Sequence, residues 1–491
     1  MVVATGRCRM GLNSPAARTR RFALSVILAC ALPSALAAGS RDASDPFATG
    51  SLAAPAPQQS VHPGHVPAPC EAAADPTVAL SLADIVSNAL CNNPQTRAAW
   101  ANALVQAAQV GIARSAYLPT LSATASAEAV HGSGALGASS AHTARDGTGN
   151  LSLGYVLYDF GARDAALDVA LQTVASANYT QDATLQRVIL SAVQAYYQLF
   201  GTRDAVASTE EAERAARQSF EAATARYQAG TATPSDRLLA QTAYSQAALN
   251  RIQAQGAEKS AEGSLANVMG AAANHPFQYV APQLRPPDRS FEGDIGRLIA
   301  VAVEQRPDLA AAQAQVEAAA AGVRVARASG MPTISLSANI NYTDSSVTPA
   351  FNTQTAGILF NIPLFTGYNT TYRIRSARAQ LEGQIALRDN LKSQVTLDVW
   401  QAYYALETGT EAVRSTSDLV ASAEAAERVA LGRYKAGAGT ILDTLTAQAA
   451  LANARLQHIQ AQYSWYVLRA NLAQALGQLD PATATSPTAV P

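Results

Sequence analysis

The sequence contains the same unit twice, and this duplication limits the possible folds more than any other feature. The segment from Arg433 to Asp443 repeats the segment from Arg226 to Asp236 at an offset of 207 residues. The same offset pairs Ala402-Tyr403-Tyr404 with Ala195-Tyr196-Tyr197. A unit of about 200 residues is far longer than the ~20 to 50 residues of a solenoid repeat. The sequence therefore predicts two copies of one architecture.

Each copy of the repeated segment predicts a helix, a reversal and a second helix. Gly230 and Gly437 allow the backbone conformation that ends a helix, and Pro234 suits the first turn of the next one. Helices as long as those before the reversals need a coiled-coil or bundle context. The long helices are predicted at Ala162–Ala229 and Gly367–Ala436, and the returning helices at Ser235–Gly270 and Ile441–Gly477.

The pattern changes to that of strands at one place in each copy. Apolar residues alternate with polar ones from Leu121 to Ala129 and from Ile334 to Tyr342, which is the period of a strand. A second alternating segment follows each of these, at Leu151–Phe160 and at Ala356–Phe365. Shorter helices precede the strands, at about Ser81–Asn92, Pro94–Ser115, Asp294–Gln305 and Pro307–Met331.

Four strands of about 10 residues can cross a bilayer when tilted, but they cannot close a barrel. An open sheet edge in hydrocarbon leaves peptide groups unpaired, at a cost of several kcal/mol each. If the strands span a membrane, several chains must therefore combine them, and a trimer would form a twelve-stranded barrel. The other interpretation is a small soluble sheet that caps a helical rod.

Composition excludes several classes of function. Charged residues make up 14% of the chain, against about 25% in an ordinary soluble domain, which suits tightly packed helices. The net charge of −1 gives no reason to expect nucleic acid as a partner. There is no P-loop and no spacing typical of a nucleophile and its base. We expect no catalytic residue, cofactor or metal site, and no enzyme.

The two ends of the chain are predicted to lie outside the repeats. Arginines followed by the apolar run Phe22–Leu32 and the small residues Ala35-Leu36-Ala37 indicate a signal peptide over residues 1–37. An uncleaved anchor and lipidation at Cys30 are the alternatives. The remaining divisions are a disordered Pro/Ala-rich leader at 38–77, a first repeat at 78–270, a linker at 271–291, a second repeat at 292–477 and a disordered tail at 478–491.

Cleavage of the signal would leave two cysteines, Cys70 and Cys91. An oxidising compartment allows them to form a disulfide. The alternative is that Cys91 is a small buried residue and Cys70 a free thiol.

The sequence from residue 78 to 477 resembles the TolC family of trimeric outer-membrane channel-tunnels. The resemblance rests on the two Tyr-x-x-Gly-x-x-x-x-x-Asp reversals and on three shorter motifs in order. It implies a mostly α-helical, duplicated channel with a twelve-stranded transmembrane β-barrel, four strands per chain, continued by a long periplasmic α-helical barrel. The motifs are Ala113-Arg114-Ser115-Ala116-Tyr117-Leu118-Pro119, Tyr158-Asp159-Phe160-Gly161 and Pro363-Leu364-Phe365-Thr366-Gly367.

The resemblance also implies how the inner end is gated. In the family, a tyrosine and an arginine of the second repeat bond to an aspartate of the first. Tyr434 and Asp236 match the tyrosine and the aspartate, which implies a hydrogen bond between them. Gly439 stands in the position of the arginine, and this departure predicts an easier or differently held gate. Arg226 and Arg433 lie nearby but do not match the latch position.

Aspartates of the second repeat line the family's narrowest point, where Asp443 matches one and Thr446 stands in place of the other. Three copies of Asp443 around an axis would repel one another, which raises the pKa of some of them, and would attract cations. The alternative for Asp236 and Asp443 is helix capping, which stabilises a first turn by ~0.3–1 kcal/mol and is compatible with gating. The reversal residues expected at the docking site for an adaptor are Tyr227, Gly230, Gly437 and Gly439.

The implied function is that of a passive exit duct in the outer membrane of a Gram-negative bacterium, a homotrimer in contact with outer-membrane lipid. Its partners would be a periplasmic adaptor and an inner-membrane transporter of the ABC or another class. The run Leu90-Cys91-Asn92-Asn93-Pro94-Gln95-Thr96-Arg97 resembles the branch that includes the outer-membrane component of adenylate cyclase toxin secretion, which favours type I protein secretion. The alternatives are multidrug efflux through the same fold and a periplasmic coiled-coil protein that does not conduct.

Overall fold

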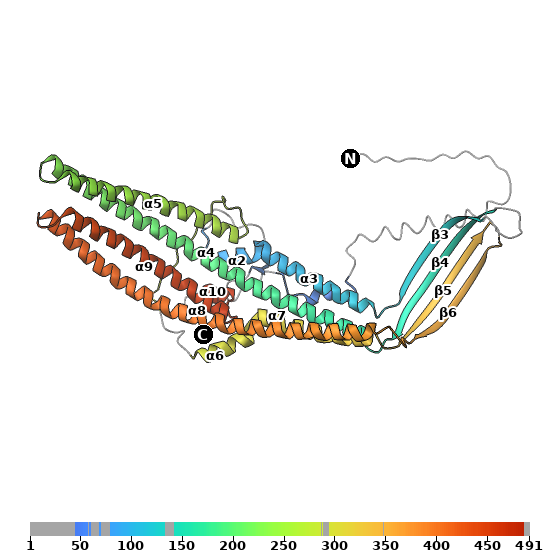
Figure 1. Ribbon diagram of the computed structural model, residues 1–491. Helices are drawn as coiled ribbons and strands as arrows, with labels where there is room; N and C mark the ends of the chain where they lie inside the picture. Colours follow the sequence, from blue (N-terminus) through green and yellow to red (C-terminus); the bar gives the residue numbers. More distant parts are fainter. Residues whose placement is uncertain are drawn as a thin grey trace, which may run out of the picture. The chain divides into compact units, whose positions relative to one another are not determined.

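The computed structural model describes residues 45–56, 58–59, 68–69, 79–132, 142–285, 287, 294–346 and 348–485. The predicted signal peptide at 1–37 lies outside these residues. The helices and strands of the described residues belong to one unit, residues 49–491. Within it, each repeat contains two short helices, two strands, a long helix and a returning helix in that order (Figure 1).

The helices of the two repeats have equal lengths, which confirms the duplication. The first two helices contain 11 and 22 residues in both repeats. The long helix contains 67 residues and the returning helix 35 in both. The first repeat comprises α2 (Leu82–Asn92), α3 (Pro94–Ser115), α4 (Ala162–Gln228) and α5 (Pro234–Val268); the second comprises α6 (Ile295–Gln305), α7 (Pro307–Ala328), α8 (Asn369–Lys435) and α9 (Ile441–Ala475).

The predicted starts of the short helices are confirmed and have local causes. Ser81 and Asp84 form a capping box at α2, in which the Asp84 N–H donates to Ser81 Oγ at 3.3 Å and the Ser81 N–H to Asp84 Oδ2 at 2.9 Å. The Asn93 side chain accepts from the next helix, and Pro94 and Pro307 occupy the first positions of α3 and α7. Proline fits there because the N–H that it lacks has no partner within the helix.

The four strands of the two repeats, which the alternation predicted, form one antiparallel sheet in the order β3-β4-β5-β6 (Figure 1). Leu151 of β4 pairs with Ile340 of β5, and Leu336 of β5 with Ile358 of β6. The strands at the two edges are therefore β3 and β6. Their bounds are β3 Thr120–Gly132, β4 His142–Tyr158, β5 Thr333–Ser345 and β6 Phe351–Asn361.

Several strand boundaries differ from the prediction. β6 begins at Phe351 and not at Ala356, and β3 and β5 continue to Gly132 and Ser345. β4 begins at His142 and not at Leu151, because the polar segment before Leu151 continues the ladder with β3. Ser126 and Thr148 illustrate this, since their hydroxyls lie 2.7 Å apart across the two strands. β6 ends at Asn361 and not at Phe365, just before Pro363, and proline cannot donate a ladder hydrogen bond.

The main core lies midway along the long helices. One cluster of buried residues includes Leu199 of α4 and Leu265 of α5, and a second includes Leu406 of α8 and Leu472 of α9. Tyr197 connects them, because its ring packs against both clusters and stacks on Tyr466 at 4.8 Å between centroids. The core therefore joins the two repeats within one chain. None of the described helices has both the length and the apolarity that crossing a membrane requires.

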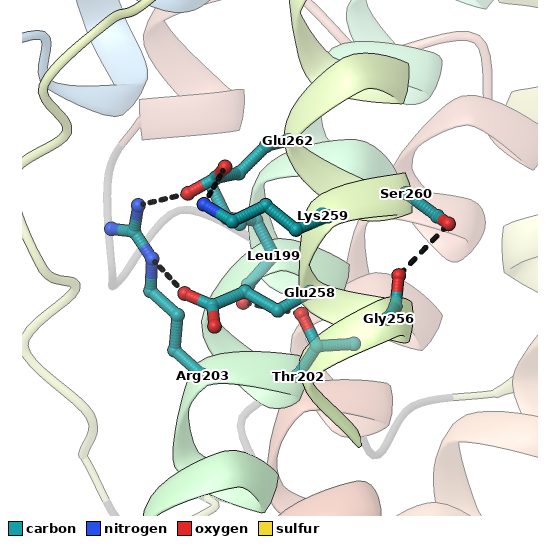
Figure 2. A network of polar contacts seen from close by, with 8 residues as sticks. All are labelled: Leu199, Thr202, Arg203, Gly256, Glu258, Lys259, Ser260 and Glu262. Atoms are coloured by element: carbon teal, nitrogen blue, oxygen red, sulfur yellow. Dashed lines mark hydrogen bonds and ion pairs between the residues drawn. The ribbon is translucent and has the colours of Figure 1, made fainter. Parts of the chain in front are cut away.

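Ion pairs hold α5 against α4 beside this core. Arg203 of α4 contacts Glu258 at 3.3 Å and Glu262 at 3.1 Å, and Lys259 contacts Glu262 at 2.9 Å (Figure 2). The Arg203 guanidinium also lies 5.7 Å from the ring centroid of Tyr279, in the linker between the repeats. Solvated pairs of this kind contribute at most about 1 kcal/mol each to the stability of the fold. Their main effect is therefore to fix the alignment of α5 along α4.

The predicted disorder of the leader 38–77 is wrong for residues 49–56. A short 3-10 helix, η1 (Thr49–Leu52), and the residues after it pack on α3 and α4. Asn178 of α4 donates to the Leu52 carbonyl at 2.8 Å and accepts from the Ala54 N–H at 2.8 Å. No sequence pattern predicted this order, because the segment has no apolar period and its hydrogen-bond partner lies more than 120 residues away.

The tail predicted to be disordered at 478–491 is ordered as far as residue 485. The α10 helix (Pro481–Thr485) follows Leu479, whose side chain is buried in the main core. Asp480 and Thr483 form reciprocal hydrogen bonds around the start of the helix. Leu479 and Ala484 anchor this segment to the core, and two apolar residues are too few for a sequence pattern to reveal.

Cys91 of α2 is disulfide-bonded. The other cysteines of the chain, Cys70 among them, lie outside the described residues, so the predicted Cys70 partner is not placed. Two strands of two residues each, β1 (Gln58–Gln59) and β2 (Ala68–Pro69), pair with each other within the segment predicted as the leader.

Candidate gate and docking site

The two reversals have the same backbone structure. In the first, the Thr231 N–H donates to the Arg226 carbonyl at 2.9 Å and the Gly230 N–H to the Tyr227 carbonyl at 3.0 Å. The corresponding bonds of the second reversal, from Ala438 to Arg433 and from Gly437 to Tyr434, measure 2.9 and 3.1 Å. Gly230 and Gly437 have φ values of +72° and +75°. Each reversal is therefore a Schellman motif, which needs a left-handed residue that glycine supplies at least cost.

Asp236 and Asp443 cap the helices that follow the reversals. The Asp236 N–H donates to Thr233 Oγ1 at 3.2 Å, while Asp236 Oδ2 accepts from the Thr233 N–H at 3.0 Å. Asp443 and Thr440 form the same box, with both bonds at 3.1 Å. Asp443 is exposed and Asp236 is half-buried. The capping interpretation therefore holds for both residues, and the predicted gating role, which capping does not exclude, stays a prediction.

The cap also sets the protonation of Asp443. The hydrogen bond from the Thr440 N–H, then that from the Thr440 side chain, lowers the pKa of the Asp443 carboxyl from its ordinary value of 3.8. The opposite shift predicted for Asp443 concerns three copies around an axis. In a trimer, repulsion between the carboxylates would raise the pKa of Asp443, opposing the lowering by Thr440 seen in the single chain.

The tyrosines of the two reversals lie in different surroundings. Tyr227 is 41% exposed, whereas Tyr434 is only 7% exposed. Tyr434 packs with Ala223 and Ala240 of the first hairpin and with Ile441 of its own. The α8–α9 tip thus inserts its tyrosine side chain between helices of the first repeat.

Arg226 covers the buried tyrosine. Its guanidinium carbon lies 4.1 Å from the ring centroid of Tyr434, and its Nη2 donates to the Tyr434 carbonyl at 2.9 Å. The equivalent residue of the second repeat, Arg433, donates instead to the Ala438 carbonyl of its own reversal at 3.3 Å. The sequence placed both arginines at the same point of the pattern. Nothing in their spacing indicated that only Arg226 contacts the other hairpin.

The predicted Tyr434–Asp236 hydrogen bond is not among the contacts of the described residues in this single chain. The Asp236 carboxylate bonds to Thr233, and the Tyr434 ring faces Arg226. Gly439 lies against the end of α8, where an added Cβ would come within 3.1 Å of Arg433 Cβ and 3.2 Å of the Tyr434 nitrogen. A larger residue is crowded at the latch position, which gives a physical reason for glycine there.

Other reversal residues remain on the surface. Nothing lies within 4 Å of the position that a Cβ would take at Gly230 or Gly437. The exposed Tyr227 ring has the Arg237 guanidinium 5.4 Å from its centroid. The four residues expected at the docking site thus divide into an exposed group, Tyr227, Gly230 and Gly437, and the half-buried Gly439.

A series of polar contacts joins α4 of the first repeat to the α8–α9 hairpin of the second, leading toward the tip. The Tyr463 hydroxyl donates to Asp204 at 2.6 Å, and burial followed by this bond raises the pKa of Tyr463. Further toward the tip, Arg455 contacts Glu211 at 2.9 Å. Ser219 then donates to Gln448 at 3.1 Å. Arg226 and Tyr434 are the last contact in this series.

Comparison with known proteins supports one assignment for this architecture. The outer membrane efflux protein family matches residues 85–271 and 298–478, one match per repeat. Protein CyaE of Bordetella pertussis is 32% identical over 84% of this chain and 88% of its own. The outer membrane efflux protein BepC of Brucella suis is 26% identical over 81% and 86% of the two chains.

The fold has counterparts among solved structures. The outer membrane protein VceC of Vibrio cholerae superposes with a TM-score of 0.71 at 23% identity, over 81% of this chain and 96% of that one. Members of the family are transport proteins of the outer membrane that extend into the periplasm, and they are not enzymes. This chain belongs to the outer membrane efflux protein family, the family of TolC-type channels.

Proposed function

We propose that this protein is the outer-membrane exit duct of a tripartite export machine, and that it conducts cargo passively from an inner-membrane transporter and its periplasmic adaptor to the outside. Channels of this family form homotrimers that work with such partners. The observation that carries the proposal is the open four-stranded sheet joined to a long helical hairpin in each repeat.

The sheet supports assembly into a trimer. Strands β3 and β6 each have one edge without a partner strand in the described sheet. In hydrocarbon such an edge costs several kcal/mol per peptide group, so β6 of one chain would pair with β3 of the next. Three chains with four strands each would close a twelve-stranded barrel. The sheet also exposes large apolar side chains suited to lipid, including Leu121, Ile340, Ile358 and Phe360.

The reversals support contact with an adaptor and control of the inner end. Their exposed residues, Tyr227, Gly230 and Gly437, would meet the adaptor. Asp236, Tyr434 and Asp443 would form the gate. In a trimer, three Asp443 carboxylates close to the axis would attract cations, which predicts a cation-selective pore.

We favour type I protein secretion over drug efflux as the use of this duct. The run Leu90–Arg97 resembles the branch that serves adenylate cyclase toxin secretion, and identity to Protein CyaE is higher than to the efflux protein BepC. The secreted proteins of a deletion strain, its parent and a complemented strain decide between the two. Loss of a large polypeptide from the medium supports secretion, whereas an unchanged medium with new drug sensitivity supports efflux.

Conduction is tested on the purified trimer in a planar bilayer. We expect a cation-selective conductance, and Asp443→Asn should reduce the selectivity. A protein that forms no pores while the trimer is intact would contradict the proposal. Such a protein, if released with the soluble periplasm without detergent, would instead be the structural coiled-coil protein that the sequence left as an alternative.

A further inference from the structure

We propose that Arg226 is the latch of this duct, and that it holds the gate closed by binding the ring face and the main-chain carbonyl of Tyr434 across the two hairpins of one chain. The inference rests on the proposed function, since it assumes that the tip opens to pass cargo. It differs from the latch that the resemblance implied, which uses the tyrosine hydroxyl and an arginine at the position of Gly439.

The contact satisfies two groups at once. The Tyr434 carbonyl belongs to the last turn of α8, where carbonyls lack partners within the helix and the helix dipole favours a cation. It accepts both the Gly437 N–H at 3.1 Å and Arg226 Nη2 at 2.9 Å. The rest of the guanidinium lies 4.1 Å from the ring centroid, within the range of a cation–π interaction. One arginine thus binds a helix end and its aromatic residue together.

The position of Arg226 makes it the contact that opening must break first. The contacts at Asp204, Glu211, Ser219 and Arg226 follow one another along α4, and each joins α4 to the second hairpin. When the tip of α8 and α9 swings away from α4, displacement is largest at the end of the helices. Among these four contacts, Arg226 lies nearest the tip, so its contact is stretched most by the opening motion.

The chain provides a matched control in its own duplication. Arg433 has the same position before the corresponding reversal, but it is exposed and its side chain donates to the Ala438 carbonyl within its own hairpin. Replacing Arg433 removes the same charge from the same height of the tunnel without separating the hairpins. A difference between Arg226→Ala and Arg433→Ala therefore reports the contact across the hairpins and not the loss of a positive charge.

Open probability of the trimer in a planar bilayer is the first measurement. Arg226→Ala should raise the open fraction about tenfold, because both a charged hydrogen bond and a cation–π contact are lost. Arg226→Lys should recover part of the closed state, and Arg433→Ala should leave the conductance as it is. An Arg226→Ala trimer that gates like the parent, or an Arg433→Ala trimer that opens as much, would overturn the inference.

A double variant separates this latch from the hydroxyl latch. Tyr434→Phe keeps the ring and the carbonyl but removes the hydroxyl, so Arg226→Ala should have the same effect in that background as in the parent. If its effect disappears there, the hydroxyl is part of the latch and the inference is wrong.

Hydrogen exchange of residues 433–441 gives a readout that needs no pore. Arg226→Ala should speed exchange in this segment of the detergent-solubilised trimer more than Arg433→Ala does, and unchanged exchange would overturn the latch. If the parent forms no pores, the proposed function fails, and the exchange result still decides whether Arg226 holds the hairpins together.

Discussion

The reversal of the first repeat and that of the second share a Schellman motif, a threonine–aspartate capping box and a left-handed glycine, but they differ in what covers them. Tyr434 is 7% exposed and Tyr227 is 41% exposed, although both follow an arginine and precede a glycine by three residues. Arg226 crosses to the other hairpin, whereas Arg433 folds back on its own. Duplication has thus preserved what the backbone needs locally and allowed the side chains to take different tertiary roles.

Truncating the two tyrosines should produce the largest difference between the reversals. Tyr434→Ala removes a buried ring, which typically costs about 3 kcal/mol or more, whereas Tyr227→Ala on the surface should cost less than about 0.5 kcal/mol. Local opening free energies from hydrogen exchange of residues 436–445 and 229–238 measure this, since global unfolding of a trimer is not two-state. Equal losses at the two sites would show that assembly buries Tyr227 as well.

Substituting the two reversal glycines should lower the local stability of both reversals by the same amount. Gly230→Ala and Gly437→Ala both place a side chain at positive φ with no neighbour within 4 Å, so each should cost about 1 kcal/mol through backbone strain alone. Gly432→Ala is the control, because Gly432 lies inside α8 with open space around it and alanine there should stabilise the helix slightly. A much larger loss of local opening free energy at one reversal would show that another chain contacts that glycine in the trimer.

The capping threonines should also behave alike, with a smaller effect. Thr233→Ala and Thr440→Ala each remove a side-chain acceptor at the start of a helix, which typically costs ~1 kcal/mol or less on an exposed helix. Exchange rates in the first turns of α5 and α9 provide the measurement. Serine at either position keeps the acceptor and should restore protection, so a serine variant as unstable as the alanine variant would argue against capping.

Local rules explain why so much of the fold was predictable. The caps at Ser81 and Asn93, the prolines that open α3 and α7 and the glycines of the reversals act within a few residues of their own position. The helix boundaries therefore matched to within about two residues, the usual uncertainty of a helix end, except that α7 ends at Ala328 and not at Met331. The alternation of β3 and β5 is likewise a local signal.

What could not be predicted depends on residues far apart in the chain. Residues 49–56 are fixed by Asn178 and Gln181 of α4, and Leu479 by a core that several helices build. At the candidate site, the sequence analysis predicted Asp236 as the partner of Tyr434, whereas the residue that contacts the Tyr434 ring and carbonyl is Arg226. The two arginines are equivalent in the repeat, and only the packing of one hairpin on the other selects Arg226.

Acid should affect the second reversal through Asp443, in a direction that depends on assembly. In the single chain, hydrogen bonds from Thr440 lower the pKa of Asp443 below 3.8. A lowered pKa means that the cap is fully stabilising above the unfolded value and is lost as pH falls through the folded value. In a trimer with three carboxylates near the axis, repulsion would raise the pKa of Asp443, and protonation would then occur at higher pH.

Hydrogen exchange of the first turn of α9, corrected for the intrinsic rate at each pH, should therefore change at lower pH in dissociated chains than in trimers. Asp443→Asn should abolish both transitions. If the transition falls at the same pH in the two states, the Asp443 carboxylates are too far apart to form a ring, and capping is the whole role of this residue.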